Sequence, residues 1–217
     1  MGTGRTTVQE RVLNLYIKHY VIKMESSKHI ILGSGSPRRK EIMESLGFSF
    51  EVDNQNNFNE IYSADIPHEE IPALMSEGKS EGFHRPLDDN EILVTSDTMV
   101  LCGNRIMGKP RNSSEAADML RFLSGKEHKV ITSVTIRDNK NKETFTDTAT
   151  VYFKELSDKE IEYYIRTCQP YDKAGAYAIQ EWIGHIGITS INGSFYTIMG
   201  VPAHLVYEKL NKFLNLE

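Results

Sequence analysis

Cysteine is scarce in this sequence of 217 residues, which contains only Cys102 and Cys168, far apart along the chain. A disulfide framework is therefore not expected, and a reducing compartment, the cytoplasm, fits this cysteine usage. The two cysteines lack the spacing of a metal site, and no cluster of histidine and cysteine supplies one. No stretch approaches the roughly 20 apolar residues that a membrane span needs. The sequence therefore predicts a cytoplasmic protein without a membrane partner.

Positive charge is outnumbered, with 25 Lys and Arg against 30 Asp and Glu and a formal net charge of −5. A general polyanion binder is therefore excluded, and stable binding to nucleic acid is not expected. Any phosphate site would have to be a local cluster of cations. The hydrophobic content of 39% and charged content of 25% are ordinary for a globular protein. The length suits one large domain or two small ones.

Residues 1–28 are expected to lie outside the folded domain as an N-terminal extension. Lys18 and His19 interrupt their apolar run, and no small-residue cleavage site follows, so they make a poor signal peptide. Two origins are open: an amphipathic upstream extension, or a cloning remnant ahead of a natural start at Met24. We expect residues 29–217 to form a single domain.

Strand and helix patterns alternate along residues 29–217. Apolar or alternating runs predict strands over residues 30–32, 48–52, 92–101, 130–136, 144–153 and 186–191. Helical spacing with capping residues predicts helices over residues 36–47, 67–83, 112–125, 157–165 and 202–214. Interleaved elements of this kind are typical of an α/β fold with a mixed sheet and flanking helices. We expect one compact domain with two lobes around a central cleft.

A turn of small residues, in LGSGSPRRKE, leads from the first predicted strand into the first helix. It lacks the third glycine of the dinucleotide fingerprint and the Gly-Lys-Ser/Thr ending of a P-loop. Ser36 is expected to cap the helix, which puts Arg38 and Arg39 in its first turn. The helix dipole disfavours arginine there, whereas a bound phosphate would make both guanidinium groups favourable. The segment is therefore either a solvated basic helix start or a phosphate site.

Two further polar residues, Asp97 and Lys109, lie in local sequence surroundings that favour a functional role. Asp97 lies within the apolar run ILVTSDTMVLCG, and an isolated buried carboxylate costs several kcal/mol unless it is paired or binds a metal. It either caps a neighbouring loop or serves metal or water at the rim of a cleft. Lys109 lies between Gly108 and Pro110, which restrict the backbone and suit a lysine aimed at one place.

The stretch PYDKAGAYAIQ mixes charge with small residues directly after a predicted helix. The amide of Gln180 could read the edge of a planar base, but on spacing alone a structured turn with an Asp172–Lys173 surface pair is favoured. His128 is expected to be structural. No convincing Ser/His/Asp or Cys/His set for nucleophilic catalysis is present.

Four segments in succession resemble one family. LGSGSPRRKEIMESLGFSF, SDTMV, GKPRNSSEAADMLRFLSGKEHKVITSV and YDKAGAYAIQ…INGSFYTIMGVP are similar to signatures of the Maf family, from Ile30 to about Leu210. These are nucleoside triphosphate pyrophosphatases, historically named septum-formation inhibitors. The resemblance implies a Maf/ITPase-like fold that hydrolyses a nucleoside triphosphate to the monophosphate and pyrophosphate. It also implies a divalent cation, Mg²⁺ or Mn²⁺, and a homodimer.

The resemblance also implies roles for individual residues. Asp97 matches the catalytic proton acceptor and, together with Glu60, the metal site. Phosphate contacts are implied for Ser34, Arg38, Arg39, Lys79 and Lys109, and base selection for Arg38, Thr98 and Gln180.

The stretch DKAGAYAIQ resembles the family branch that prefers dTTP and UTP, which implies an enzyme that limits misincorporation of modified pyrimidine nucleotides. Three residues depart from the family pattern: Asn59 replaces a common acid, Ser96 an alanine and Glu181 a glycine. Two alternatives stay open. One is a nucleotide-binding regulator of cell division without significant turnover, and the other is the same chemistry on purine triphosphates such as ITP.

Overall fold

The structure, a computed structural model, describes residues 26–216. The expected extension over residues 1–28 lies outside the described residues except for its last part, Ser26–Lys28. Lys28 Nζ donates hydrogen bonds to the Asp138 carboxylate at 3.2 Å and to the Phe213 carbonyl at 2.7 Å. The chain is therefore packed against the fold from Lys28 onward.

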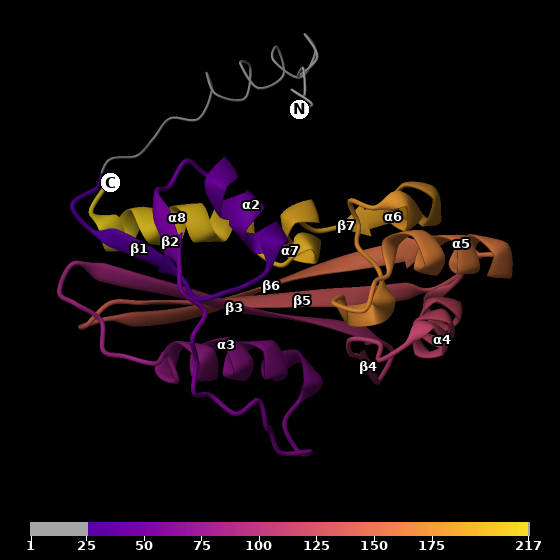
Figure 1. The fold of residues 1–217 in the computed structure, drawn as a ribbon, viewed down its shortest axis with the longest axis horizontal. Coiled ribbons are helices and arrows are strands. Elements are labelled where there is room, and N and C mark those ends of the chain that lie inside the picture. Colours follow the sequence, from indigo (N-terminus) through magenta and orange to yellow (C-terminus); the bar gives the residue numbers. More distant parts are fainter. Residues whose placement is uncertain (1–25, 217) are drawn as a thin grey trace, which may run out of the picture.

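One mixed sheet of seven strands runs through the molecule (Figure 1). Its strands are β1 (His29–Leu32), β2 (Phe50–Val52), β3 (Glu91–Cys102), β4 (Arg105–Met107), β5 (Glu127–Arg137), β6 (Lys142–Phe153) and β7 (Ile188–Asn192). The order is β2-β1-β3-β5-β6-β7, and β4 also pairs with β3. β1 is parallel to β2 and β3, whereas the remaining pairs are antiparallel. The predicted α/β fold with a mixed sheet is confirmed.

Helices cover both faces of this sheet. They are α2 (Pro37–Ser45), α3 (Ile71–Glu81), α4 (Ser113–Leu123), α5 (Asp158–Cys168), α6 (Trp182–Gly187), α7 (Phe195–Met199) and α8 (Ala203–Leu214), with short 3₁₀ turns η1 (His68–Glu70) and η2 (Ala174–Ala176). In Figure 1, α2, α7 and α8 lie on one face and α3 lies on the other. Within residues 26–216, no helix has the length and apolar character needed to cross a bilayer.

Successive residues of β3 point to opposite faces, and this alternation places the polar residues of the strand. Val94 packs in the core under α2, α7 and α8, whereas Met99 packs against α3. Because side chains alternate along a strand, Thr98 faces the α2 side and Asp97 faces α3. Two neighbouring residues of one strand thus present their polar groups on opposite faces of the sheet.

Two of the predicted helix N-termini are confirmed by their caps. Ser157 and Glu160 form the capping box of α5, and the Asn112 side chain caps α4. The prediction for Ser36 is wrong in one respect: it occupies the N-cap position of α2 but its side chain makes no capping hydrogen bond. The turn instead uses the Ser34 hydroxyl, which accepts from the Ser36 N–H at 3.3 Å. The first turn of α2 is therefore left without a side-chain acceptor, a state that a bound anion complements.

The predicted elements differ most from the observed ones after Gln180. The strand predicted over residues 186–191 begins only at Ile188, because Trp182–Gly187 form α6. α6, α7 and β4 are not predicted, since at six, five and three residues they are too short to show a periodic pattern. A Cβ on Gly184 would lie 2.0 Å from the Ile179 carbonyl oxygen. Glycine there lets α6 pack directly onto the turn that precedes it.

Candidate active site

The candidate site lies in a gap between β1 and β4, which both pair with the same edge of β3. Whereas β5 pairs along the opposite edge of β3, β1 pairs with residues 91–94 of this edge and β4 with residues 100–102. Within the described part of the chain, residues 95–99 therefore have no strand neighbour on this side. The chain leaves β1 toward Ser34 and leaves β4 toward Lys109, so both loops flank Asp97.

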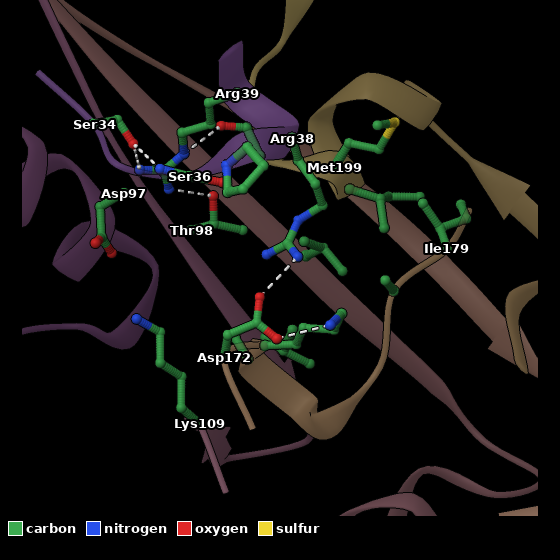
Figure 2. A pocket seen from close by; sticks show the side chains of 18 of the residues that line it. Ser34, Ser36, Arg38, Arg39, Asp97, Thr98, Lys109, Asp172, Ile179 and Met199 are labelled. Carbon is green, nitrogen blue, oxygen red and sulfur yellow. Dashed lines mark hydrogen bonds and ion pairs between the residues drawn. The ribbon is translucent and has the colours of Figure 1, made fainter. Parts of the chain in front are cut away.

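A pocket of about 410 Å³ opens at this gap (Figure 2). Its lining includes most of the residues expected at the site: Ser34, Arg38, Arg39, Lys79, Asp97, Thr98, Lys109 and Gln180. Residues from α7 also line it, namely Ile198 and Met199, followed by Gly200. Sequence reasoning misses these three, because nothing in their short apolar segment distinguishes a pocket wall from core.

Arg39 is held in place by four hydrogen bonds. Its guanidinium donates to the carbonyls of Ser96 and Gly200 at 2.7 and 3.2 Å and to the hydroxyls of Ser34 and Thr98 at 3.3 and 3.2 Å. Burial lowers the pKa of Arg39 from its ordinary value, while Asp97 acts to raise it. Arg39 is thus a fixed positive charge at the edge of β3 and not a solvated helix start.

Arg38 lies in a different environment although it is the adjacent residue. Its Nη1 donates to Asp172 Oδ2 at 3.2 Å, across the pocket from α2 (Figure 2). Only this one hydrogen bond restrains the Arg38 guanidinium within the described residues. An anion entering the pocket could therefore compete with Asp172 for Arg38.

Two carboxylates and one ammonium gather on the α3 side of β3. Lys79 Nζ lies 2.6 Å from Asp97 Oδ1 and 2.9 Å from Glu60 Oε1. Asp97 therefore bonds to a side chain and does not serve as the cap of a loop. The hydrogen bond from Lys79 lowers the pKa of Glu60, and Lys109 and Arg39 act in the same direction. Lys79, which is expected to contact phosphate, is therefore paired with two carboxylates and lies on the other face of the sheet from Arg38.

Lys109 extends into the pocket from the loop after β4. Figure 2 shows its ammonium pointing toward Asp97 from the side opposite Arg39. The Gly108 carbonyl accepts a hydrogen bond from the Gly175 N–H at 3.0 Å, which ties this loop to η2. The expectation that the backbone around Lys109 is fixed agrees with this contact.

The segment from Asp172 to Gln180 forms the far wall of the pocket. Lys173 does pair with Asp172, with Nζ 2.7 Å from Oδ1, but only Asp172 lies at the surface, since its side chain is 59% exposed and that of Lys173 is 8% exposed. Gln180 Oε1 is buried and accepts no hydrogen bond from any described residue. An unpaired buried acceptor beside a pocket is a group that a ligand donor can satisfy.

His128 lies behind the pocket wall, as its expected structural role requires. Its Nε2 lies 2.7 Å from the hydroxyl of Tyr177, and its ring stacks on Phe153 with centroids 5.4 Å apart. Burial lowers the pKa of His128 to about 4. The residue is therefore neutral in the folded protein at pH 7.

We expect this histidine to make the fold sensitive to mild acid. Its pKa is lower in the folded state than the ordinary 6.5, so the unfolded chain binds more protons between those values. The contribution of neutral His128 to the unfolding free energy is therefore present above pH 6.5 and is lost as the pH falls toward 4. The expected loss in unfolding free energy between pH 6.5 and 5 is about 1.5 kcal/mol. Urea unfolding of wild type and His128→Gln at both pH values checks this, and an equal pH dependence in the two proteins would contradict it.

Among the described residues, no group of three or more His, Cys, Asp and Glu side chains gathers as a metal site. Glu60 and Asp97, the metal ligands that the family resemblance implies, both bond to the Lys79 ammonium. A divalent ion at this position would have to take further oxygen ligands from elsewhere, as Mg²⁺ does from substrate phosphates.

Comparison with known proteins gives a consistent result. Residues 29–213 match the family model described as Maf-like protein. The chain is 44% identical over 186 residues to the dTTP/UTP pyrophosphatase of Porphyromonas gingivalis, covering 85% of this chain and 94% of the relative. It is 45% identical over 183 residues to the dTTP/UTP pyrophosphatase of Bacteroides thetaiotaomicron, covering 84% and 95%. The protein of the same description in Christiangramia forsetii is 45% identical over 186 residues, covering 86% and 94%. The chain belongs to the Maf family.

Proposed function

We propose that this protein hydrolyses dTTP and UTP to the nucleoside monophosphate and pyrophosphate. Its similarity to three dTTP/UTP pyrophosphatases supports the reaction and the substrates. The observation that carries the proposal is the position of Asp97, a carboxylate at the edge of the pocket with the cations Arg39, Lys79 and Lys109 around it. This is the arrangement that water attack on a triphosphate requires.

The cations of the pocket have different roles in binding the triphosphate. Arg38 and Lys109 approach the pocket from opposite walls and lack the dense bonding of Arg39, so they are free to contact phosphate oxygens. Ser34 and the uncapped first turn of α2 add hydrogen-bond donors on the wall of the pocket that carries Arg38. Arg39 supplies fixed positive charge where negative charge develops in the transition state.

Asp97 acts as the proton acceptor for the attacking water. The water oxygen forms a bond to the α-phosphorus, its proton goes to the Asp97 carboxylate, and the bond from the α-phosphorus to the bridging oxygen breaks to release pyrophosphate. Lys79 donates to Asp97 Oδ1 at 2.6 Å and so fixes the direction of the carboxylate. The second carboxylate oxygen is left for water.

A divalent cation, Mg²⁺ or Mn²⁺, belongs to this proposal. Asp97 and Glu60 fit it because hard cations take oxygen ligands, and the two carboxylates already converge on one positive charge, the Lys79 ammonium. When bound, the ion neutralises phosphate charge and favours displacement of pyrophosphate. The binding residues on this chain would be Asp97 and Glu60.

Base selection is assigned to Gln180, with Thr98 and Arg38 contributing. Gln180 presents a buried oxygen without a protein donor, and the N–H of a uracil or thymine ring is a donor that can meet it. Thr98 contributes by holding Arg39 and forming the floor of the pocket. Arg38 lies between the α2 turn and Asp172 on the wall that carries Gln180.

Replacing Gln180 with alanine is expected to change the ranking of nucleotides more than the handling of phosphate. The ratio of kcat/KM for dTTP to that for dCTP should fall by roughly tenfold, because one buried hydrogen bond is worth about 1 kcal/mol or more. Inhibition by inorganic pyrophosphate, which reports the phosphate end, should stay the same. An unchanged ranking of the nucleotides would contradict a base-reading role.

Pyrophosphate release, measured over the canonical triphosphates and ITP with Mg²⁺ and with Mn²⁺, tests the proposed function directly. The expected result is release from dTTP and UTP well above release from the others. Binding without release would favour the alternative of a nucleotide-sensing regulator, and release from ITP alone would favour purine chemistry. Neither alternative has an observation of its own in the pocket.

Four expectations accompany this proposal. Residues 29–217 form one domain, and the helices on the two faces of the sheet act as two lobes around the pocket. The protein works in the cytoplasm and forms a homodimer. Light scattering of the purified chain tests the dimer, and limited proteolysis tests the single domain.

A further inference from the structure

Gln180 lies in the middle of a tight turn at the end of the pocket wall. The Glu181 N–H donates to the Ala178 carbonyl at 3.1 Å, which closes the turn around Ile179 and Gln180. Gly184 of α6 packs against the Ile179 carbonyl from behind. The direction of the Gln180 amide is therefore set by whatever fixes the two ends of this turn.

Both ends of the turn are bonded to one hydroxyl group. Tyr164, a fully buried residue of α5, accepts from the Ala178 N–H at 3.2 Å and donates to the Glu181 carboxylate. Burial, together with this carboxylate, raises the pKa of Tyr164, so the hydroxyl keeps its proton and remains a donor. The first and last residues of the turn thus share a single anchor in the core.

Glu181 is also held from a second side. Its Oε1 lies 3.2 Å from Lys173 Nζ, and the same ammonium lies 2.7 Å from Asp172 Oδ1. A charge pair with a nearly buried lysine resists displacement, because either partner left alone would be a desolvated charge. Asp172 in turn bonds Arg38, so this cluster reaches the opposite wall of the pocket.

We propose that Tyr164 and Glu181 are positioning residues that set base selection by holding the turn of Gln180. The proposal rests on the proposed function and deepens it, since neither residue lines the pocket. Polar discrimination between bases depends on the alignment of the amide with the base edge, and a displacement of about 1 Å is enough to lose much of it.

The test compares three substitutions with two controls. Tyr164→Phe removes the hydroxyl, Glu181→Ala removes both carboxylate bonds, and Glu181→Gln keeps an acceptor for Tyr164. Tyr207→Phe and Glu162→Ala make the same chemical changes at exposed residues of α8 and α5.

The expected result is a fall of about tenfold in the ratio of kcat/KM for dTTP to that for dCTP in Tyr164→Phe and Glu181→Ala. The loss should appear in KM for dTTP, with kcat within about threefold of wild type, because neither Tyr164 nor Glu181 bonds directly to a side chain assigned to phosphate binding. Glu181→Gln should recover most of the ratio, and the controls should match wild type. Wild-type ratios in both disrupting variants would overturn the proposal, as would an equal loss of kcat for every nucleotide.

Binding provides a second measurement that does not need turnover. Trp182, the only tryptophan of the chain, follows Glu181 directly and packs against Tyr163 with ring centroids 4.8 Å apart. Its fluorescence can report the binding of non-hydrolysable UTP and CTP analogues. A wild-type protein that binds the UTP analogue but does not cleave dTTP would overturn the proposed function, and the ratio of the two affinities would still decide the positioning role. If Tyr164→Phe fails to fold, Glu181→Ala decides, since that side chain is 26% exposed and less central to the core.

Discussion

Asp97→Asn is expected to reduce pyrophosphate release from dTTP by at least about a hundredfold, the usual contribution of a general base. Asparagine has nearly the same shape as aspartate but cannot take a proton from water at neutral pH. Two other described carboxylates lie near Asp97. Asp172 is paired with Arg38 and Lys173, and Glu60, which shares Lys79 with Asp97, does not line the pocket. Neither is therefore placed to replace Asp97 as the proton acceptor.

The same variant should retain nucleotide binding. Removing a negative charge beside Arg39 and Lys79 makes the pocket more positive, so the affinity for a triphosphate measured without the divalent ion should be equal or higher. Lys79 keeps its ion pair with Glu60 at 2.9 Å and is not left alone. Trp182 fluorescence with a UTP analogue measures binding, and a coupled phosphate assay measures release.

Asp118→Asn is the matched control, because Asp118 lies on the surface of α4 in a solvent-exposed pair with Arg121. It should leave release unchanged. Turnover close to wild type in Asp97→Asn would refute the assignment of Asp97, and loss of both binding and release would indicate a structural role.

Asp97 could be identified from the sequence because an acid interrupts an apolar strand, and that conflict is visible without a structure. Glu60 and Lys79 could not be placed in this way. They come from a loop and from α3, and only the packing of α3 on the sheet brings them to Asp97. Only the family resemblance implies roles for these two residues.

The long elements of the fold were predictable for a related reason. β5 and β6 span enough residues for β-branched alternation to appear, and α5 carries a complete capping box. By contrast, α6 and α7 are short and depend on tertiary contacts, such as the packing of Gly184 against the Ile179 carbonyl. Such contacts cannot be predicted from the local sequence. The site depends on these short elements, since α7 and the turn before α6 form two walls of the pocket.

The residue pattern of the turn alone could not distinguish Arg38 from Arg39, although the structure gives them different surroundings. Adjacent helical residues point about 100° apart, so one arginine turns into the edge of β3 and the other crosses the pocket. Arg39 makes four hydrogen bonds and Arg38 makes one, to an Asp172 side chain that is 59% exposed. A substitution at each position should therefore separate stability from binding.

Arg39→Gln is expected to lower the unfolding free energy by about 2–3 kcal/mol, because the carbonyl of Ser96 and the hydroxyls of Ser34 and Thr98 lose their donor. Pyrophosphate release should fall by more than about a hundredfold with the loss of fixed charge. Arg38→Gln should change stability by less than about 0.5 kcal/mol, because its one partner, Asp172, is solvent-exposed. Its KM for dTTP should rise by about tenfold or more, since a charge-assisted phosphate contact is lost.

Urea unfolding and steady-state kinetics on the two variants check this contrast, with Arg121→Gln on α4 as a control for removing a surface arginine. The comparison is sharp because the two changes are chemically identical and one residue apart. Equal losses of stability would contradict the bonding assigned to Arg39. An unchanged KM in Arg38→Gln would mean that Arg38 stays with Asp172 when nucleotide binds, and the phosphate would then have to be held by Lys109 and the α2 turn without it.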